Sequence, residues 1–188
     1  EGFYYRPRID IELLQKYNEG LICLSGCLKG EIPERMLKDD WNGAKEAALR
    51  FSEIFPDRFY LEIQNHGIPD EEQNIKNIKK LSSELDIPMV CTNDAHYAKH
   101  EHWEAHDVHI CLGTGKDRND PNRLRYATPE FYFKSQDQMF ELFKDIPGAI
   151  ENTRKIADSI EIEIPMGDYH LPNFPLPANL PEQTPDSY

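Results

Sequence analysis

The chain contains 188 residues and carries a formal net charge of −13, with 21 Lys and Arg against 34 Asp and Glu. A chain of this length forms one domain, or one domain with a tail, and can bury a proper core. The acidic balance excludes a free-standing nucleic-acid binder, because phosphate contacts need clustered Lys and Arg. No apolar run reaches membrane-spanning length, so we expect no membrane partner.

Short apolar runs predict three β-strands in the first half of the chain. They cover residues 21–25, 59–64 and 88–92, and each is rich in β-branched or aromatic residues. Apolar residues at helical spacing predict helices between them, over residues 38–55 and 70–85. Strands that alternate with helices indicate βαβ units, so we expect an α/β fold with a parallel sheet or barrel.

The second half of the chain is predicted to be mostly helical. Residues 101–112 follow helical spacing, and residues 130–134 are predicted to be extended. Ser135 and Gln138 have the spacing of a capping box, which predicts a helix over residues 135–144.

A further helix is predicted over residues 147–159, with Pro147 in its first turn. From Pro165 onward, prolines recur in a polar stretch that lacks periodicity. We therefore divide the chain into a folded unit, residues 1–164, and an extended Pro-rich linker or arm, residues 165–188.

The four cysteines show no paired short spacing; they are Cys23, Cys27, Cys91 and Cys111. Such scattered cysteines indicate reduced thiols in a cytoplasmic protein more than a disulfide framework.

Side-chain alternation places possible ligands at the ends of the predicted strands. Residues two apart on a strand share a face, so Cys27, His66 and the pair Asp94 and His96 can all leave the C-terminal ends. In parallel α/β folds these ends are where sites are built. A carboxylate and an imidazole two residues apart can converge on one metal ion.

Each of these residues also has an ordinary structural interpretation. Asn93-Asp94 is common in turns, and Cys27 after Gly26 suits a small residue packed beneath a turn. His66 before Gly67 suits a strand-end histidine that bonds to a carbonyl. Spacing alone leaves both interpretations open.

Three further histidines, His102, His106 and His109, follow helical steps of four and three. This spacing can bind a metal, but a metal stripe normally includes a carboxylate or an outside ligand. We favour an amphipathic helix in which His106 is partly buried and the other two are solvated.

The one basic cluster of the sequence consists of Lys116, Arg118, Arg123 and Arg125. Asp117 and Asp120 lie among them, so we expect local salt bridges in preference to a phosphate contact.

Five segments closely resemble the polymerase-and-histidinol-phosphatase (PHP) domain of the bacterial DNA polymerase III alpha subunit. They are LICLSGCLKGEIP (21–33), FYLEIQNHGIPDE (59–71), CTNDAHY (91–97), AHDVHICLGTGK (105–116) and DPNRLRYATPEFYFKS (120–135). The resemblance implies part of a distorted seven-stranded β/α barrel of the PHP type, with a helical extension and a Pro-rich C-terminal arm. Residues 1–164 would be the C-terminal part of that domain, and residues 165–188 the linker toward the polymerase palm.

The resemblance also implies a trinuclear metal site of a 3′–5′ exonuclease or phosphoesterase. Cys27 matches the family's metal-binding cysteine, and Asp94 with His96 matches its final D-x-H motif; these ligand types suit zinc, with manganese or magnesium as alternatives. His66 matches a position beside the site, where it would orient a ligand or a substrate phosphate. No side chain is assigned as catalytic, since a metal-activated water would be the nucleophile.

The family's earlier motifs, an H-x-H pair with an Asp and further His and Glu ligands, are absent from this sequence. The complete domain would hold up to three ions, whereas this chain would hold at most one, loosely, and would be inactive when isolated. The expected parent is a DNA-directed DNA polymerase, a nucleotidyltransferase of DNA replication. Its partners would be DNA, other replicase subunits, the rest of the barrel and the rest of the polymerase chain.

Two other functions stay open at this point. The domain can be a non-catalytic structural or docking domain of the replicase, although the set Cys27, Asp94 and His96 favours the active type. It can also be a stand-alone phosphoesterase of the histidinol-phosphatase type, against which the polymerase-like segments and the Pro-rich exit count.

Overall fold

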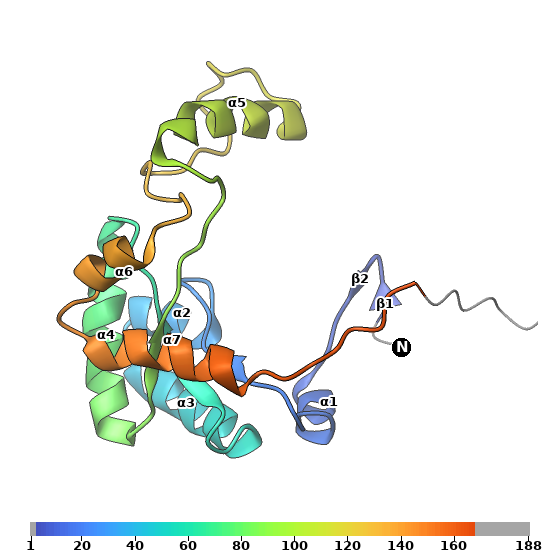
Figure 1. The fold of residues 1–188 in the computed structure, drawn as a ribbon, viewed down its shortest axis with the longest axis vertical. Helices are drawn as coiled ribbons and strands as arrows, with labels where there is room; N and C mark the ends of the chain where they lie inside the picture. The colour runs from blue at the N-terminus through green and yellow to red at the C-terminus, as the bar shows by residue number, and fades with distance from the viewer. Residues whose placement is uncertain (1–2, 168–188) are drawn as a thin grey trace, which may run out of the picture.

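The computed structural model describes residues 3–167 of the chain (Figure 1). Its elements, in chain order, are β1 (Phe3–Tyr4), β2 (Arg6–Pro7), α1 (Ile11–Lys16), β3 (Cys23–Leu24), α2 (Glu31–Leu37), α3 (Trp41–Ile54), β4 (Phe59–Ile63), α4 (Pro69–Leu85), β5 (Met89–Cys91), η1 (His100–His102), α5 (Trp103–Thr114), α6 (Gln136–Leu142) and α7 (Pro147–Ser159). None of the described helices is long and apolar enough to cross a bilayer.

The three predicted strands form one parallel sheet in the order β3-β4-β5. Cys23 pairs with Phe59, and Ile63 pairs with Cys91, so β4 is the central strand. The predicted α/β class and the parallel pairing are therefore confirmed. The seven-stranded barrel is not confirmed, because residues 3–167 contribute three parallel strands and a separate two-stranded hairpin, β1-β2.

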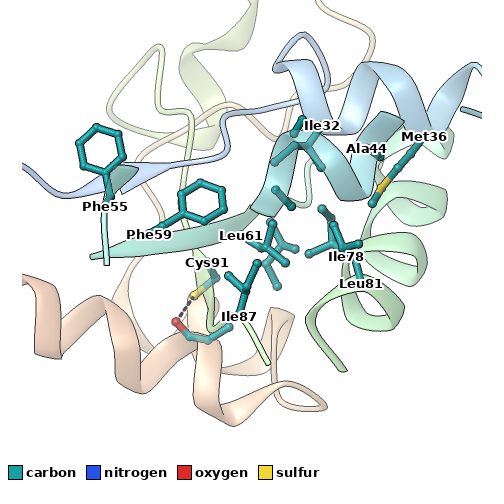
Figure 2. Packing of buried hydrophobic residues seen from close by; sticks show 14 of the residues in the cluster. Ile32, Met36, Ala44, Phe55, Phe59, Leu61, Ile78, Leu81, Ile87 and Cys91 are labelled. Atoms are coloured by element: carbon teal, nitrogen blue, oxygen red, sulfur yellow. Dashed lines mark hydrogen bonds between the residues drawn. The ribbon is translucent and has the colours of Figure 1, made fainter. Parts of the chain in front are cut away.

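The core lies on the apolar face of β4. Leu61 and Ile63 are fully buried there, and Ile78 and Leu81 of α4 are fully buried with them. Figure 2 shows Leu61 in the middle of this cluster, with Ile78, Leu81 and Ile87 beside it. The small buried residues Ala44, Ala47 and Ala48 supply the core-facing side of α3, which spans the predicted segment 38–55.

Local signals set the ends of several helices. The predicted capping box is present at α6, where the Ser135 hydroxyl and the Gln138 side chain each accept from the other residue's backbone N–H. Pro147 stands in the first turn of α7, as predicted. The sequence analysis did not predict α1, α2 or the β1-β2 hairpin.

The edge of β5 that does not pair with β4 is covered by α7. Asn152 Nδ2 donates to the Met89 carbonyl at 2.8 Å, and Thr153 Oγ1 donates to the Cys91 carbonyl at 3.2 Å. The Cys91 thiol in turn donates to the Ala149 carbonyl, the contact drawn in Figure 2. All four cysteines are free thiols, as the sequence predicts.

Residues 100–127, which we name the α5 lobe, stand apart from the sheet and its helices (Figure 1). Cys111 is the one buried residue of α5. Two chain segments join the lobe to the body: the loop 92–99, and residues 128–134, which we name the strap. They meet in a parallel bridge between Tyr97 and Tyr132.

The core position of Leu61 gives a first prediction. Leu61→Ala removes fully buried methyl groups and leaves a cavity, so it should lower the free energy of unfolding by about 2–5 kcal/mol. Leu112→Ala on the α5 lobe is the matched control, because Leu112 is 77% exposed and its replacement should change stability by less than about 0.5 kcal/mol. Urea unfolding of the purified chain measures both, and equal effects would contradict the assigned core.

Candidate functional site

Asp94 and His96 lie together in the loop that follows β5. The His96 Nδ1 atom is 3.5 Å from Asp94 Oδ1 and 3.1 Å from the Asp94 carbonyl oxygen. The strap fixes the loop, because the His96 N–H donates to the Phe131 carbonyl at 2.7 Å and Asn93 Nδ2 donates to the Tyr132 carbonyl at 3.0 Å. The two residues of the predicted D-x-H motif are thus neighbours on a partly exposed surface.

Cys27 lies in the tight loop between β3 and α2 and is exposed. Gly26 has a φ of +79°, and a side chain at Gly30 would collide with the Ser25 carbonyl oxygen, so both positions require glycine. The hollow beside Cys27 is lined by Glu62, Gln64, Glu71 and Asn74, together with Leu28. The structure therefore places Cys27 next to the polar face of β4.

The donor types of Asp94 and His96 suit zinc, but two ligands are an incomplete set. Across the part of the chain that the structure describes, no group of three or more His, Cys, Asp or Glu side chains is arranged to hold a metal ion. The structure brings Asp94 and His96 together and does not add Cys27 to them. The assignment of all three as metal ligands stays a prediction.

The polar face of β4 carries a hydrogen-bonded network. Gln64 Nε2 donates to Glu62 Oε1 at 3.1 Å and to Thr92 Oγ1 at 3.0 Å, and the Thr92 hydroxyl donates to Glu62. The Glu62 N–H donates to the Ser25 hydroxyl at 2.8 Å. These contacts place Glu62 and Gln64 on one face of β4, next to Thr92, which directly follows β5.

His66 is 1% exposed and pairs with Glu71 of α4. Its Nδ1 is 2.8 Å from Glu71 Oε1, and its backbone N–H donates to Glu71 Oε2 at 2.6 Å. The ring stacks on Phe131 at 4.4 Å and an interplanar angle of 2°, and Phe131 meets the His96 ring edge-on at 5.6 Å. His66 therefore reaches the Asp94–His96 pair through Phe131, and its ring bonds to a carboxylate where the sequence suggested a carbonyl.

The lobe histidines are placed as predicted, with His102 and His109 exposed and His106 partly buried. The His106 ring lies 5.8 Å from the His96 ring and 5.2 Å from the Tyr126 ring. Burial, and after it the nearby imidazoles of His96 and His109, lowers the pKa of His106. Sequence reasoning missed Tyr126 as a neighbour of His96, since it lies in a loop without periodicity; its only signal was the resemblance of the segment 120–135.

The predicted local salt bridges are confirmed for Lys116, Arg118 and Arg123, whereas Arg125 donates to the Arg118 carbonyl at 2.9 Å. Arg123 bonds both carboxylate oxygens of Asp107 at 2.6 Å, and Lys116 pairs with Asp120 at 3.1 Å. Arg118 lies 3.8 Å from Asp107. The hydrogen bond from Arg123 is the main reason that the pKa of Asp107 falls below its usual value.

The Glu71–His66 pair predicts an acid-sensitive stability. Burial raises the pKa of Glu71, but hydrogen bonds from the His66 side chain and backbone outweigh it, so the pKa is lowered overall. A lowered carboxyl pKa stabilises the fold above the unfolded pKa of about 4.3, and this stability is lost as the pH falls through the folded pKa. Glu71→Gln should therefore destabilise the chain at neutral pH and flatten the loss of stability in acid.

Urea unfolding at a series of pH values measures this difference. Glu72→Gln is the matched control, because Glu72 is the exposed neighbour of Glu71 on the same helix and its variant should follow the wild type. If the free energy of unfolding of Glu71→Gln falls with pH in parallel with the wild type, the Glu71 carboxylate does not cause the loss of stability in acid.

Comparison with known proteins finds similarity to one segment of DNA polymerase III alpha subunits. The sequence profile described as "PHP domain" matches residues 1–66. Over 178 residues the chain is 47% identical to the DNA polymerase III subunit alpha of Borreliella burgdorferi, and over 184 residues it is 46% identical to that of Campylobacter jejuni. It is 38% identical over 188 residues to that of Thermus aquaticus.

These matches cover 92%, 93% and 97% of the chain, but only 16%, 15% and 15% of the relatives, so the chain spans about one-sixth of their length. Over nearly its whole length the chain is therefore similar to one segment of the DNA polymerase III alpha subunits, and its residues 1–66 match the PHP-domain profile.

Proposed function

We propose that this chain works as part of the PHP domain of a DNA-directed DNA polymerase and contributes ligands to a metal-dependent site for 3′–5′ hydrolysis of DNA. The observation that carries the proposal is the Asp94–His96 pair, which stands just past β5 in a chain 38–47% identical to polymerase III alpha subunits. In this proposal the parent polymerase, and not this chain alone, carries out DNA synthesis and binds DNA and the other replicase subunits.

The geometry supports a shared site more than a self-contained one. Asp94 and His96 sit past the C-terminal end of a parallel strand, the edge where α/β folds gather functional groups. Their carboxylate and imidazole would bind one ion, Cys27 would contribute a thiolate elsewhere in the site, and other residues of the parent polymerase would complete the set. Bound zinc, manganese or magnesium would activate water and draw charge from a phosphodiester.

A non-catalytic docking domain is the second candidate, and one observation favours it. An apolar groove of about 710 Å³ lies between α6, α7 and the end of the strap. Phe133 and Phe140 line it and are 74% and 47% exposed. Apolar surface of this kind marks protein contacts, so it supports a role in assembly whether or not the metal site is active. The similarity to polymerase segments gives no support to a stand-alone phosphoesterase.

Ligand substitutions in the full-length protein test the metal site. Asp94→Asn and His96→Ala should each reduce bound zinc and the rate of 3′-end hydrolysis by at least about 10-fold, since even residues that only orient a ligand contribute that much to metal affinity. DNA synthesis should be unchanged, because Asp94 and His96 are proposed to act only in hydrolysis at the 3′ end. The measurements are metal content by mass spectrometry and hydrolysis of a 3′-labelled oligonucleotide.

His109→Ala is the control, because His109 is an exposed lobe histidine outside the pair. Full metal content and full hydrolysis in both ligand variants would refute the metal site and leave the docking domain as the better function.

The chain on its own should behave differently from its parent. We predict that the 188-residue chain binds at most one ion, loosely, because water must replace each missing ligand. It should not hydrolyse a 3′-ended oligonucleotide with added Zn²⁺ or Mn²⁺. Stoichiometric metal and turnover in the isolated chain would show that its own residues build a complete site.

A further inference from the structure

Aromatic rings from two separate parts of the chain contact the His96 ring and leave its side chain 30% exposed. Phe131 of the strap meets it at 5.6 Å and 85°, nearly perpendicular. From the α5 lobe, Tyr126 meets it at 4.6 Å and 58°, and His106 at 5.8 Å and 60°. With Nδ1 facing Asp94, the imidazole is held on several sides, and the lobe supplies half of these contacts.

Tyr126 lies against the His96 ring, with the two ring centroids 4.6 Å apart. Its ring contacts His96, and burial together with the nearby Asp94 carboxylate raises the pKa of its phenol. Tyr126 also meets Phe131 at 4.6 Å, so the lobe residue and the strap residue touch each other as well as His96.

A single guanidinium joins the loop that precedes Tyr126 to helix α5. Arg123 is 3% exposed and bonds both oxygens of Asp107, the residue that follows His106 on α5. Its Nε donates to the Arg118 carbonyl at 2.9 Å and its Nη1 to the Leu124 carbonyl at 3.1 Å. These bonds tie the loop that carries Tyr126 to the helix that carries His106. Because the Arg123 side chain is 3% exposed and makes four hydrogen bonds within the lobe, it is not presented to a DNA phosphate.

We propose that Tyr126 is a positioning residue for His96, and that the Asp107–Arg123 ion pair holds the α5 lobe so that the Tyr126 ring stays against the imidazole. Groups that surround a ligand imidazole fix the direction of its nitrogen, and their loss weakens metal affinity without removing a ligand. The part of the proposal that concerns metal affinity rests on the proposed function; the part that concerns the orientation and exposure of His96 does not.

The test compares Tyr126→Leu with Tyr126→Phe in the full-length protein. Tyr126→Phe keeps the ring, and Tyr126→Leu removes it from a partly exposed loop position outside the sheet core. The first readout needs no metal: hydrogen–deuterium exchange at the imidazole C2 position of His96, followed by mass spectrometry. We expect Tyr126→Leu to lose protection at His96 and Tyr126→Phe to retain it.

The second readout is zinc affinity by competition with a chelator. Tyr126→Leu should weaken it about 10-fold, and Tyr126→Phe should stay close to the wild type. Unchanged His96 exchange in a folded Tyr126→Leu protein would overturn the proposal. If the wild type binds no zinc, the proposed metal site is refuted. If Tyr126→Leu then still loses protection at His96, the positioning role of Tyr126 is supported.

Arg123→Ala tests the same proposal without altering the ring. It should expose His96 and weaken zinc affinity in the same direction as Tyr126→Leu. Arg118→Ala is its matched control, because Arg118 lies in the same loop near the same Asp107 but is 58% exposed at 3.8 Å. If His96 exchanges in Arg123→Ala as it does in the wild type, the proposed role of the ion pair is overturned. This result can be obtained even if Tyr126→Leu fails to fold.

Discussion

The central strand β4 buries two chemically different faces, and the rest of the structure depends on how both are satisfied. Leu61 and Ile63 face the apolar core, whereas Glu62 and Gln64 face the other way and need hydrogen-bond partners. Thr92, just past β5, supplies one partner. Because residues two apart on a strand share a face, a one-residue slip of β5 would carry Thr92 away from this network. The polar network therefore fixes the register that carries the chain on to Asp94 and His96.

The strap links the end of β4 to the loop that carries the candidate site. Thr128 donates to the His66 carbonyl at 2.6 Å, and Phe131 stacks on the buried His66 ring. The Phe131 carbonyl then accepts from the His96 N–H at 2.7 Å. A residue far along the chain thus connects the end of β4 to the loop after β5. This arrangement gives the buried His66–Glu71 pair a structural reason that does not require contact with a ligand.

The sequence predicted those features whose signals are local. The strands β4 and β5 follow from short apolar runs, and the helices α3 and α4 follow from apolar periodicity. The helix α6 follows from Ser135 and Gln138, and α7 from the position of Pro147. The short helix α2 has too few turns for a periodic signal. The proximity of Asp94 and His96 follows from their spacing of two, but the neighbourhood of Cys27 is set by the glycine-dependent loop before α2. The contact between Tyr126 and His96 joins two loops, which no periodic pattern links.

Electrostatics connects the α5 lobe to the proposed chemistry. An exposed carboxylate on a chain with a net charge of −13 repels a phosphodiester. The guanidinium of Arg123 and the ammonium of Lys116 are paired with Asp107 and Asp120, so the lobe does not reverse that repulsion. A bound divalent cation is the largest local charge in such a site and inverts its sign. In the proposed site a bound metal would therefore attract the DNA as well as activate water. Arg123 would not be needed to bind the DNA, and its ion pair with Asp107 would hold the α5 lobe in place.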